Sequence, residues 1–343
     1  MVEKARGTRS SGNPIDVRGE ATMIADAMGI WPKLAAAATG VTRLVFVDGR
    51  GRHRATIDTR QSASDRDEVE VPRADLAAAL LEAATPDAEL LQGDSIATLH
   101  QDADGVDVEF ETATPRRFDL VFGADGLHSN VRRLTFGAES TYSRPLGMFV
   151  GTVRTNVDIE NQRHVLMLNE PGRSLSVHPA GGSPLAAFIF RSREPFDYRD
   201  SAAGKRLVAH AYADVGWVSD QVLAEWQASE DIYFDAVSRI TMPTWTRGRI
   251  SLVGDAADCL SLFGEGSSNA IVAAKTLADA LMSHSGDHAI ALALAEYEAT
   301  HRRRLSRFRR GAYIGSHFLV PASGPGIALR NAGVRIANRL IRK

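Results

Sequence analysis

Asp255 is the residue whose surroundings in the sequence most favour a chemical role. It follows a short apolar and β-branched run at 250–253, which predicts a buried strand, and precedes a loop that contains Gly264 and Gly266. The apolar spacing beyond this loop predicts a helix that packs against the sheet. Glycines and a helix N-terminus let a ligand approach backbone N–H groups, while a carboxylate at the strand end can accept hydrogen bonds from sugar or ribityl hydroxyls. The alternative is that Asp255 only caps its own turn.

Asp125 repeats this arrangement elsewhere in the chain. It lies within the motif Gly-Ala-Asp-Gly at 123–126, which follows the strand-like stretch 118–122. A helix start comes next, with Ser129 as its expected N-cap. Two strand–acid–glycine elements in one chain are much less expected by chance than one.

The two motifs resemble those of the flavoprotein aromatic hydroxylases, the single-component FAD monooxygenases of the p-hydroxybenzoate hydroxylase type. The Asp-Gly motif of that family is matched at 123–132. Its Gly-Asp motif is matched at 254–257, and the flavin loop that follows is matched at 264–268. The resemblance runs from Val2 to about residue 310, and its two central motifs are specific.

The resemblance implies an α/β fold with two parts. One part is a Rossmann-like FAD-binding domain, and the other is a substrate domain built on an antiparallel sheet, with a C-terminal helix after them. The expected ranges are 1–40, 71–135 and 246–285 for the discontinuous FAD-binding domain, 41–70 and 136–245 for the substrate domain, and 286–343 for the C-terminal helical segment.

The family begins with a strand, a Gly-x-Gly-x-x-Gly turn and a helix that bind the FAD pyrophosphate. No such turn is present near the start of this sequence, so the FAD-binding domain is expected to be incomplete at its N-terminus. Residues 1–5 resemble the family's second strand, which ends in an acid that binds the adenosine ribose. Glu3 is therefore the candidate ribose ligand, and the alternative is a solvated surface charge.

Further cofactor-binding residues follow from the resemblance. Asp255 would bind the ribityl hydroxyls, residues 264–268 would offer N–H groups to the pyrimidine end of the flavin, and Asp125 would support the junction between the domains. Arg73 matches the family's Arg-x-x-Leu and Arg18 matches a loop beside the isoalloxazine, with ordinary ion pairs as the alternatives. The complete expected set is Glu3, Arg18, Arg73, Asp125, Gly254, Asp255, Gly264, Gly266, Ser267 and Ser268.

An apolar pocket over the flavin is expected to bind the substrate. The candidates for its wall are Phe149, His178, Phe188, Phe190 and Arg191. For each phenylalanine the alternative is ordinary core packing, which is the commoner role of this residue type. The sequence identifies no catalytic residue and no metal ligands, because it shows neither a Ser-His-Asp order nor a cluster of metal-binding side chains.

The resemblance implies an FAD- and NAD(P)H-dependent monooxygenase that uses molecular oxygen to hydroxylate an aromatic or polyketide- or antibiotic-like small molecule through a flavin C4a-hydroperoxide. Such chemistry requires a pocket that excludes water. The alternative is a flavin-free member of the fold, which would be a binding protein, a non-redox enzyme or a nonfunctional truncated remnant. The two acidic motifs favour the monooxygenase, and the missing pyrophosphate turn favours the alternative.

Composition excludes several other classes of protein. The chain has 343 residues, 24% charged residues and a formal net charge of -2, which are ordinary for a soluble globular protein and give no nucleic-acid footprint. Its single cysteine, Cys259, excludes an intramolecular disulfide framework. No apolar run reaches the roughly 20 residues of a membrane span and no signal peptide opens the chain, so a cytoplasmic location is expected. A monomer or homodimer is expected as well. The basic run at 301–310 is expected to be the solvated face of a helix.

Overall fold

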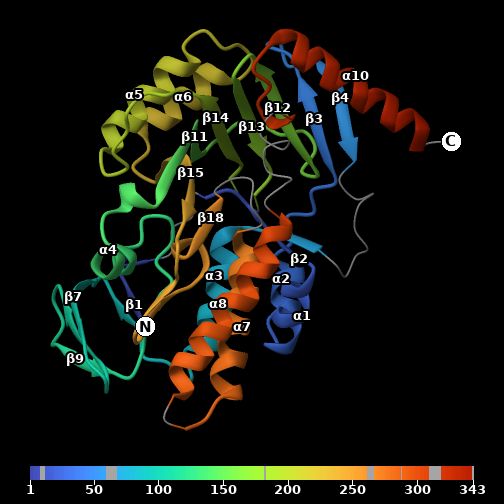
Figure 1. The fold of residues 1–343 in the computed structure, drawn as a ribbon. Helices are drawn as coiled ribbons and strands as arrows, with labels where there is room; N and C mark the ends of the chain where they lie inside the picture. The colour runs from blue at the N-terminus through green and yellow to red at the C-terminus, as the bar shows by residue number, and fades with distance from the viewer. Residues whose placement is uncertain are drawn as a thin grey trace.

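A computed structural model describes residues 1–7, 12–58, 68–180, 183–260, 266–286, 288–308 and 318–341. The fold is mixed α/β, with one large sheet in the upper part of the molecule and several helices and smaller sheets below it (Figure 1). The combination of parallel strand pairs with a separate, mainly antiparallel sheet confirms the predicted fold class.

The large sheet has eight strands, and neighbouring strands are antiparallel except for one parallel pair, β12 and β3. In sheet order the strands are β18 (Asp258–Leu260), β15 (Ile232–Thr241), β11 (Ser143–Arg154), β14 (Leu185–Arg191), β13 (Arg173–His178), β12 (His164–Glu170), β3 (Arg43–Val47) and β4 (His53–Asp58). The sheet therefore joins a hairpin from the first sixth of the chain to strands that come more than a hundred residues later.

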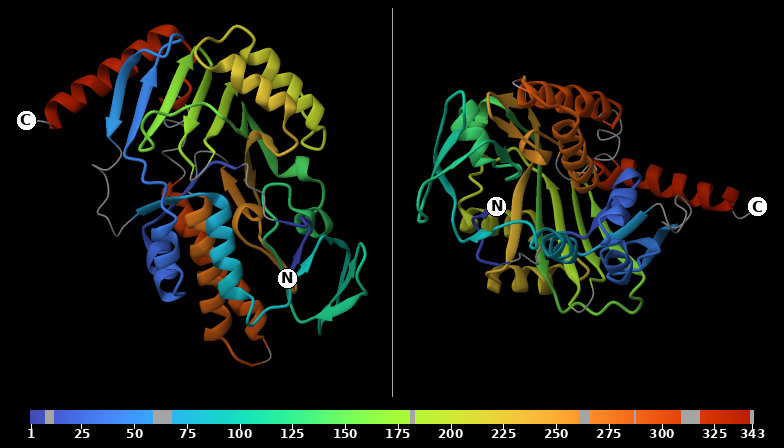
Figure 2. Two further views of the ribbon diagram at one scale, coloured as in Figure 1. Left: turned by 180° about the vertical axis from the view of Figure 1, so that it is seen from behind. Right: turned by 90° about the horizontal axis from the view of Figure 1, so that it is seen from below.

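The two faces of this sheet differ because side chains alternate along a strand. One face is apolar and packs against α5 (Ser201–Tyr212) and α6 (Ser219–Ala228), which lie over β11 and β14 (Figure 1). Trp226 is fully buried there, and its ring meets that of Phe188 edge-on at 5.5 Å between centroids. On the opposite face, α10 (Gly324–Ile341) crosses β4 and β12, as both views of Figure 2 show.

The lower part contains short sheets whose strands come from distant segments. Besides β12 and β3 of the large sheet, the described residues form two parallel pairs, and both lie in this lower part. They are β1 (Val2–Glu3) with β6 (Leu91–Gln92), and β10 (Val121–Gly123) with β17 (Ile250–Leu252), which also pairs with β16 (Thr246–Arg247). The antiparallel groups are β2 (Ile15–Arg18) with β5 (Glu68–Val71), and β7 (Ile96–Gln101), β8 (Val106–Phe110) and β9 (Arg116–Phe118).

Helices surround these short sheets. They are α1 (Glu20–Ala27), α2 (Trp31–Ala36), α3 (Arg73–Ala84), α4 (Asn130–Phe136), α7 (Gly266–Ser283) and α8 (Ala289–Phe308), with single 3-10 turns η2 (Glu139–Thr141) and η3 (Gly254–Ala256). The predicted cap of α4 is confirmed, because the Ser129 hydroxyl accepts a hydrogen bond from the backbone N–H of Arg132 at 2.9 Å. Across the parts of the chain that the structure describes, no helix is long and apolar enough to cross a membrane.

The core of the lower part forms where α7 and α8 pack beside β17. Trp245 and Tyr297 are both fully buried in it, and the Tyr297 hydroxyl donates a hydrogen bond to the backbone oxygen of Leu252 at 3.1 Å. This bond satisfies a polar group that burial would otherwise leave without a partner. The end of β17, where the Gly-Asp motif begins, is thereby fixed to α8.

Gly123 tests how closely this core is packed. A Cβ at this position would lie 2.7 Å from the Cβ of Val131 and 2.9 Å from Cδ2 of Leu252. We therefore expect Gly123→Ala to lower the free energy of unfolding by about 1–3 kcal/mol, which is the usual range for overpacking a core. Gly333→Ala is the control, since Gly333 lies within α10 with no heavy atom within 4 Å of its added Cβ. Urea denaturation should show the first variant destabilised and the second slightly stabilised, and equal midpoints would contradict the expectation.

Candidate functional site

The Gly-Asp motif forms the turn η3 between β17 and β18, directly beside the N-terminus of α7. Gly254 has a positive φ of 62°, and a Cβ on it would lie 3.2 Å from the Cβ of Ala270 on α7. Glycine therefore permits both the backbone conformation and the close approach of the helix. A Cβ on Gly266 would lie 3.4 Å from Oδ1 of Asp255, so the carboxylate borders the first residue of α7.

Asp255 is held in a partly dehydrated environment. Burial raises the pKa of its carboxyl group, while a hydrogen bond from the Cys259 thiol and the positive charge of Arg73 act in the opposite direction. Arg73 is the first residue of α3, and its guanidinium lies against Gly12, where an added Cβ would be 2.8 Å from Nε. The structure thus brings together three predicted residues, Asp255, Arg73 and Gly266, from three separate segments.

The N-terminus of α7 supplies backbone donors to the same region. The first turn of a helix has N–H groups without intrahelical partners and carries a partial positive charge. Gly266 and Ser267 open this turn. Ser268 instead links two elements, because its hydroxyl accepts a hydrogen bond from the Arg18 N–H at 3.1 Å and donates one to the Asp16 carbonyl at 3.0 Å. The predicted residue Gly264 lies outside the described residues.

Arg18, Glu3 and Asp125 have local partners. Arg18 forms ion pairs with Asp16 and, at 3.4 Å, with Glu68. The Glu3 carboxylate accepts a hydrogen bond from the Ala5 N–H at 2.7 Å, at the end of β1. Asp125 accepts hydrogen bonds from the Ser129 hydroxyl and from the Val131 N–H, the latter at 2.9 Å. These contacts show structural uses for the three side chains, and their roles in binding a cofactor stay predictions.

Arg132 is a fully buried cation that binds the backbone of the Gly-Asp turn. Its guanidinium donates hydrogen bonds to the carbonyl of Ala256 at 3.0 Å and to that of Leu127 at 2.6 Å. Burial lowers the pKa of Arg132, an effect that the negative charge of Glu139 opposes. Since Ala256 directly follows Asp255, this contact restrains the backbone that carries the site's carboxylate.

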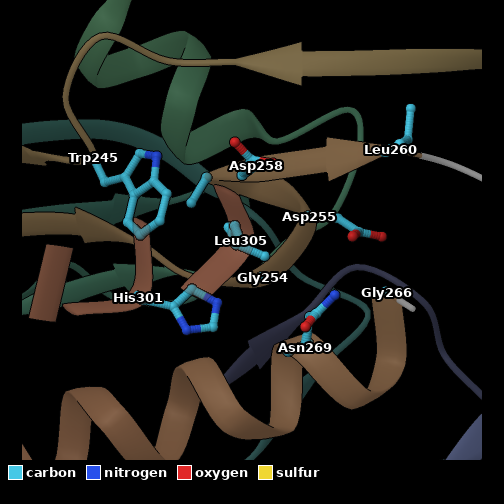
Figure 3. Close-up of a pocket in the computed structure, with 11 residues that line it drawn as sticks. Trp245, Gly254, Asp255, Asp258, Leu260, Gly266, Asn269, His301 and Leu305 are labelled. Atoms are coloured by element: carbon cyan, nitrogen blue, oxygen red, sulfur yellow. The ribbon is translucent and has the colours of Figure 1, made fainter. Parts of the chain in front are cut away.

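A small cavity of about 40 Å³ adjoins the turn. In Figure 3 the rings of Trp245 and His301 lie at one end of it, and Asp255 and Gly266 lie at the other. Trp245 Nε1 and His301 Nδ1 are buried, and neither has a hydrogen-bond partner among the described residues. The volume exceeds the roughly 10–15 Å³ that one water molecule needs, so ordered water can satisfy these two atoms.

The predicted substrate residues are divided between the two faces of the large sheet. Phe149, Phe188 and Phe190 lie on the apolar face, where each is no more than 3% exposed beneath α5 and α6. His178 and Arg191 lie on the opposite face with Leu185 and Met148, their cross-strand partners. The structure therefore does not gather the five residues into one wall.

The opposite face contains polar residues that the sequence did not single out. Ser176, Thr152 and Tyr233 share one row across β13, β14, β11 and β15, and we call them the polar row. The Ser176 hydroxyl is 2.9 Å from His178 Nε2, and burial lowers the pKa of His178 to about 4, so this imidazole is neutral at pH 7. The alternation of side chains along each strand predicts which residues share a face. The sequence does not show which strands are neighbours, so it could not predict the row.

Tyr233 connects the polar row with the Gly-Asp site. Burial raises the pKa of its phenol, and the charges of Asp235, Arg73 and Asp255 also act on it. These groups are therefore close enough to Tyr233 to interact electrostatically. At 36% exposure the ring is still accessible, in contrast to the phenylalanines on the other face.

A larger recess lies where β11 bulges. The pairing of β11 with β15 shifts between Pro145 and Phe149, and a recess of about 650 Å³ opens there. It is lined by the β11 bulge, the segment 192–196 and Ala236. Phe149 borders this recess, which is large enough for a small molecule.

The residues around Asp255 fit part of an FAD molecule. The partly buried carboxylate of Asp255 can accept hydrogen bonds from the ribityl hydroxyls. The N-terminus of α7 favours an electron-rich edge of the flavin ring, and the guanidinium of Arg73 favours oxygen anions. The missing Cβ of Gly266 leaves the approach to Asp255 open. The sequence contains no Gly-x-Gly-x-x-Gly turn, so these residues account for the ribityl and ring portions and not for the pyrophosphate. Such a donor set is compatible with part of a flavin site, and the roles of these side chains in binding the cofactor stay predictions.

Comparison with known proteins agrees with this fit. A family model described as an FAD binding domain matches residues 2–311. The chain is 39% identical over 309 residues to the uncharacterized protein Rv1260 of Mycobacterium tuberculosis, covering 87% of this chain and 82% of that protein. It is 33% identical over 328 residues to a flavin-dependent monooxygenase of Legionella longbeachae, covering 93% and 83%. The crystal structure of the tetracycline destructase Tet(55) matches with a TM-score of 0.82 at 30% identity, covering 97% and 87%.

The chain belongs to the FAD-dependent monooxygenases of the aromatic hydroxylase-like family. It is accordingly an oxidoreductase with FAD as its cofactor, and the predicted family is confirmed. The flavin-free alternative rests on one missing motif, the Gly-x-Gly-x-x-Gly turn. The family match, in contrast, covers residues 2–311.

Asp255 offers a direct test of the site. We expect Asp255→Ala to weaken FAD binding by about 10- to 100-fold, because hydrogen bonds to a charged group typically contribute that much. Flavin fluorescence quenching during a titration of the protein into FAD would measure the dissociation constant. Asp279→Ala is the control, since Asp279 lies on α7 but pairs with Lys275 at its exposed surface. Equal FAD affinities for the two variants would show that the carboxylate of Asp255 does not contact the cofactor.

Proposed function

We propose that this monooxygenase oxidises an oxygen-rich, ring-containing small molecule of the aromatic, polyketide or tetracycline type, with NAD(P)H as the electron donor. The observation that carries the proposal is the polar row on the face of the sheet turned away from α5 and α6. Hydroxyl groups at regular spacing on a sheet can hydrogen-bond several oxygen atoms of one rigid ring system. The name of the structural relative Tet(55), a tetracycline destructase, supports a substrate of this kind.

The balance of the proposed reaction is that of a monooxygenation. One oxygen atom of O2 enters a carbon–hydrogen bond of the substrate, and the other leaves as water. Two electrons come from NAD(P)H, which becomes NAD(P)+, and one proton comes from solvent. FAD, when bound, supplies the electron transfer and the activation of oxygen.

The side chains of this protein have binding and positioning roles in the proposal. Asp255 accepts hydrogen bonds from the ribityl hydroxyls, and Arg73 balances the charge of the nearby carboxylate. The N–H groups that open α7 favour negative charge at the pyrimidine end of the ring. Tyr233, the exposed member of the polar row, orients an oxygen atom of the substrate, and the apolar side chains of Val150 and Ile189 on the same face exclude water.

Ser174 gives this face a further unused hydrogen-bonding group. Its hydroxyl is buried, with the residue 1% exposed, and it has no hydrogen-bond partner among the described residues. It lies opposite Ile189 in the β13–β14 pairing, next to the polar row. A buried polar atom without a partner is costly, and a bound oxygen-rich ligand would remove this cost.

Absorbance spectroscopy and a substrate assay test the proposed function together. Purified protein mixed with FAD should retain a flavin absorbance band after desalting, and it should oxidise NADH or NADPH faster when tetracycline is added. Mass spectrometry should then detect a product that is heavier by one oxygen atom. Retention of flavin without any substrate-stimulated oxidation would overturn the proposed substrate class. Failure to bind FAD at all would support the flavin-free alternative.

Tyr233 provides a test of the substrate-binding face. Tyr233→Phe should raise the KM for an oxygen-rich substrate by about tenfold, because one hydrogen bond is lost, while FAD affinity stays unchanged. Steady-state kinetics with NAD(P)H at saturation would measure the change. Thr98→Val is the control, because Thr98 lies in β7 and bonds Glu109 at a distant surface. A KM equal to that of the wild type would exclude a substrate contact for the phenol.

A further inference from the structure

His128 forms two hydrogen bonds that join separate parts of the molecule. It follows the Asp-Gly motif, and its ring nitrogens lie 2.9 Å from Oε1 of Glu139 and 2.8 Å from Oδ2 of Asp235. A carboxylate accepts hydrogen bonds, and so both ring nitrogens must donate. An imidazole with two N–H donors is the positively charged form.

The surroundings of His128 favour that charged form. Burial alone would lower the pKa of the imidazole, but the hydrogen bonds and charges of Asp235 and Glu139 outweigh it and raise the pKa to about 9. The ring also stacks on Tyr198, with 3.5 Å between centroids and 10° between planes. Two cations face this group: Arg132 lies 3.4 Å from Glu139, and Arg199 lies over the Tyr198 ring at 5.1 Å.

Each partner of His128 leads to a different side of the proposed site. Asp235 lies in β15, and residues two apart in a strand point to the same face, so Asp235 and Tyr233 share one face. On the other side, Glu139 pairs with Arg132, whose guanidinium donates to the carbonyl of Ala256 in the Gly-Asp turn. A continuous series of polar contacts therefore runs from β15 through His128 to η3.

A purely local role does not explain these contacts. The start of α4 is already capped by Ser129, and Asp125 holds the loop before it. The partner Asp235 is 107 residues away along the chain and only 6% exposed. Burying a carboxylate is costly unless a positive partner is present, so this pair is stable only when the two segments are correctly placed.

We propose that His128 is a positioning residue that sets the placement of β15, and with it Tyr233, relative to the Gly-Asp turn beside the flavin. The expected effect on substrate binding through Tyr233 rests on the proposed function. The contact of β15 with η3 through His128, which we call the link, does not depend on it. The backbone pairing of β15 with β18 already joins the two segments at one end. Loss of either hydrogen bond would remove the second restraint, which acts near Tyr233 and Ala256.

The link has a defined pH dependence. The folded-state pKa of about 9 is above the ordinary value of 6.5, so the stabilisation from His128 is complete below about pH 6.5. It decreases above that pH and is lost as the pH rises through about 9. Glu139, Asp235, Arg132, Arg199 and Tyr198 are the charged or titratable groups that face the imidazole on the elements packed around it.

Hydrogen–deuterium exchange of the protein without added flavin tests the link directly. In His128→Gln we expect exchange to be about tenfold faster in both 232–241 and 254–260 at pH 7, because a charge-assisted hydrogen bond typically contributes at least that factor. His53→Gln is the matched control, because His53 is exposed and bonds only Thr56 among the contacts of its ring. Faster exchange confined to 125–136 would overturn the proposal.

A second variant and a pH series keep the test decisive if His128→Gln folds poorly. Glu139→Gln preserves the shape of the side chain and should lower the pKa of His128, measured by NMR titration, while the Asp235 contact remains. The thermal midpoint of the wild type should fall between pH 7 and 10 more steeply than that of His128→Gln. Parallel pH profiles for the two proteins would contradict the inference.

FAD and substrate measurements separate this inference from the proposed function. If the wild type binds FAD, His128→Gln should raise KM for the substrate more than it changes the dissociation constant for FAD. The rise in KM that the wild type should show at alkaline pH should be absent from this variant. If the wild type binds no FAD, the proposed function fails. The exchange comparison still decides whether His128 links β15 to η3.

Discussion

The close contact between α7 and the turn after β17 is the constraint on which the site depends. At Gly254 the backbone adopts a positive φ, and the absence of a side chain leaves Ala270 space to approach. This approach places the N-terminus of α7 beside Asp255, so a carboxylate lies next to N–H groups that have no partners within the helix. Arg132 binds the backbone of this turn at Ala256, and Tyr297 from α8 binds the end of β17 at Leu252. The chemistry of the site is therefore a product of how two elements pack.

The two faces of the large sheet have different roles, because one packs against helices and the other contains the polar row. Much of its apolar face packs against α5 and α6, with aromatic contacts around Phe188 and Trp226. Because strands have a period of two, burying that face fixes the direction of every residue on the other one. Tyr233 and Asp235 therefore point to the face that meets the Asp-Gly loop, where His128 binds Asp235.

Some of these features were predictable from local sequence, and others were not. The strand at 250–252, the helix that follows the glycine loop and the Ser129 cap are encoded by neighbouring residues, and the structure contains them. Phe188 and Phe190 are strongly apolar in the sequence, but only the sheet order shows that they face helices. The His128–Asp235 pair joins residues 107 positions apart, and a single sequence gives no signal for such a contact.

The basic run near the end of the chain is divided between solvent and core. A solvated helix face was expected, and Arg303 is exposed. His301, however, is 4% exposed, and Arg302 lies over the Trp245 ring at 4.4 Å. The spacing of the sequence could have predicted that His301 is buried. Residues 293, 297, 301 and 305 recur every fourth position and form the buried side of α8.

The parallel pairing of β3 with β12 has a consequence for how this protein is made. Arg43 lies opposite His164, so 121 residues, the difference between these positions, are added after Arg43 before its partner is complete. At roughly 5–20 residues per second, β3 leaves the ribosome about 6–24 s before β12 can join it. During that interval β3 has only β4 as a neighbour, and an isolated two-stranded hairpin is marginally stable. The nascent chain therefore carries an unpaired strand edge during this part of its translation, and such an edge can pair with another chain.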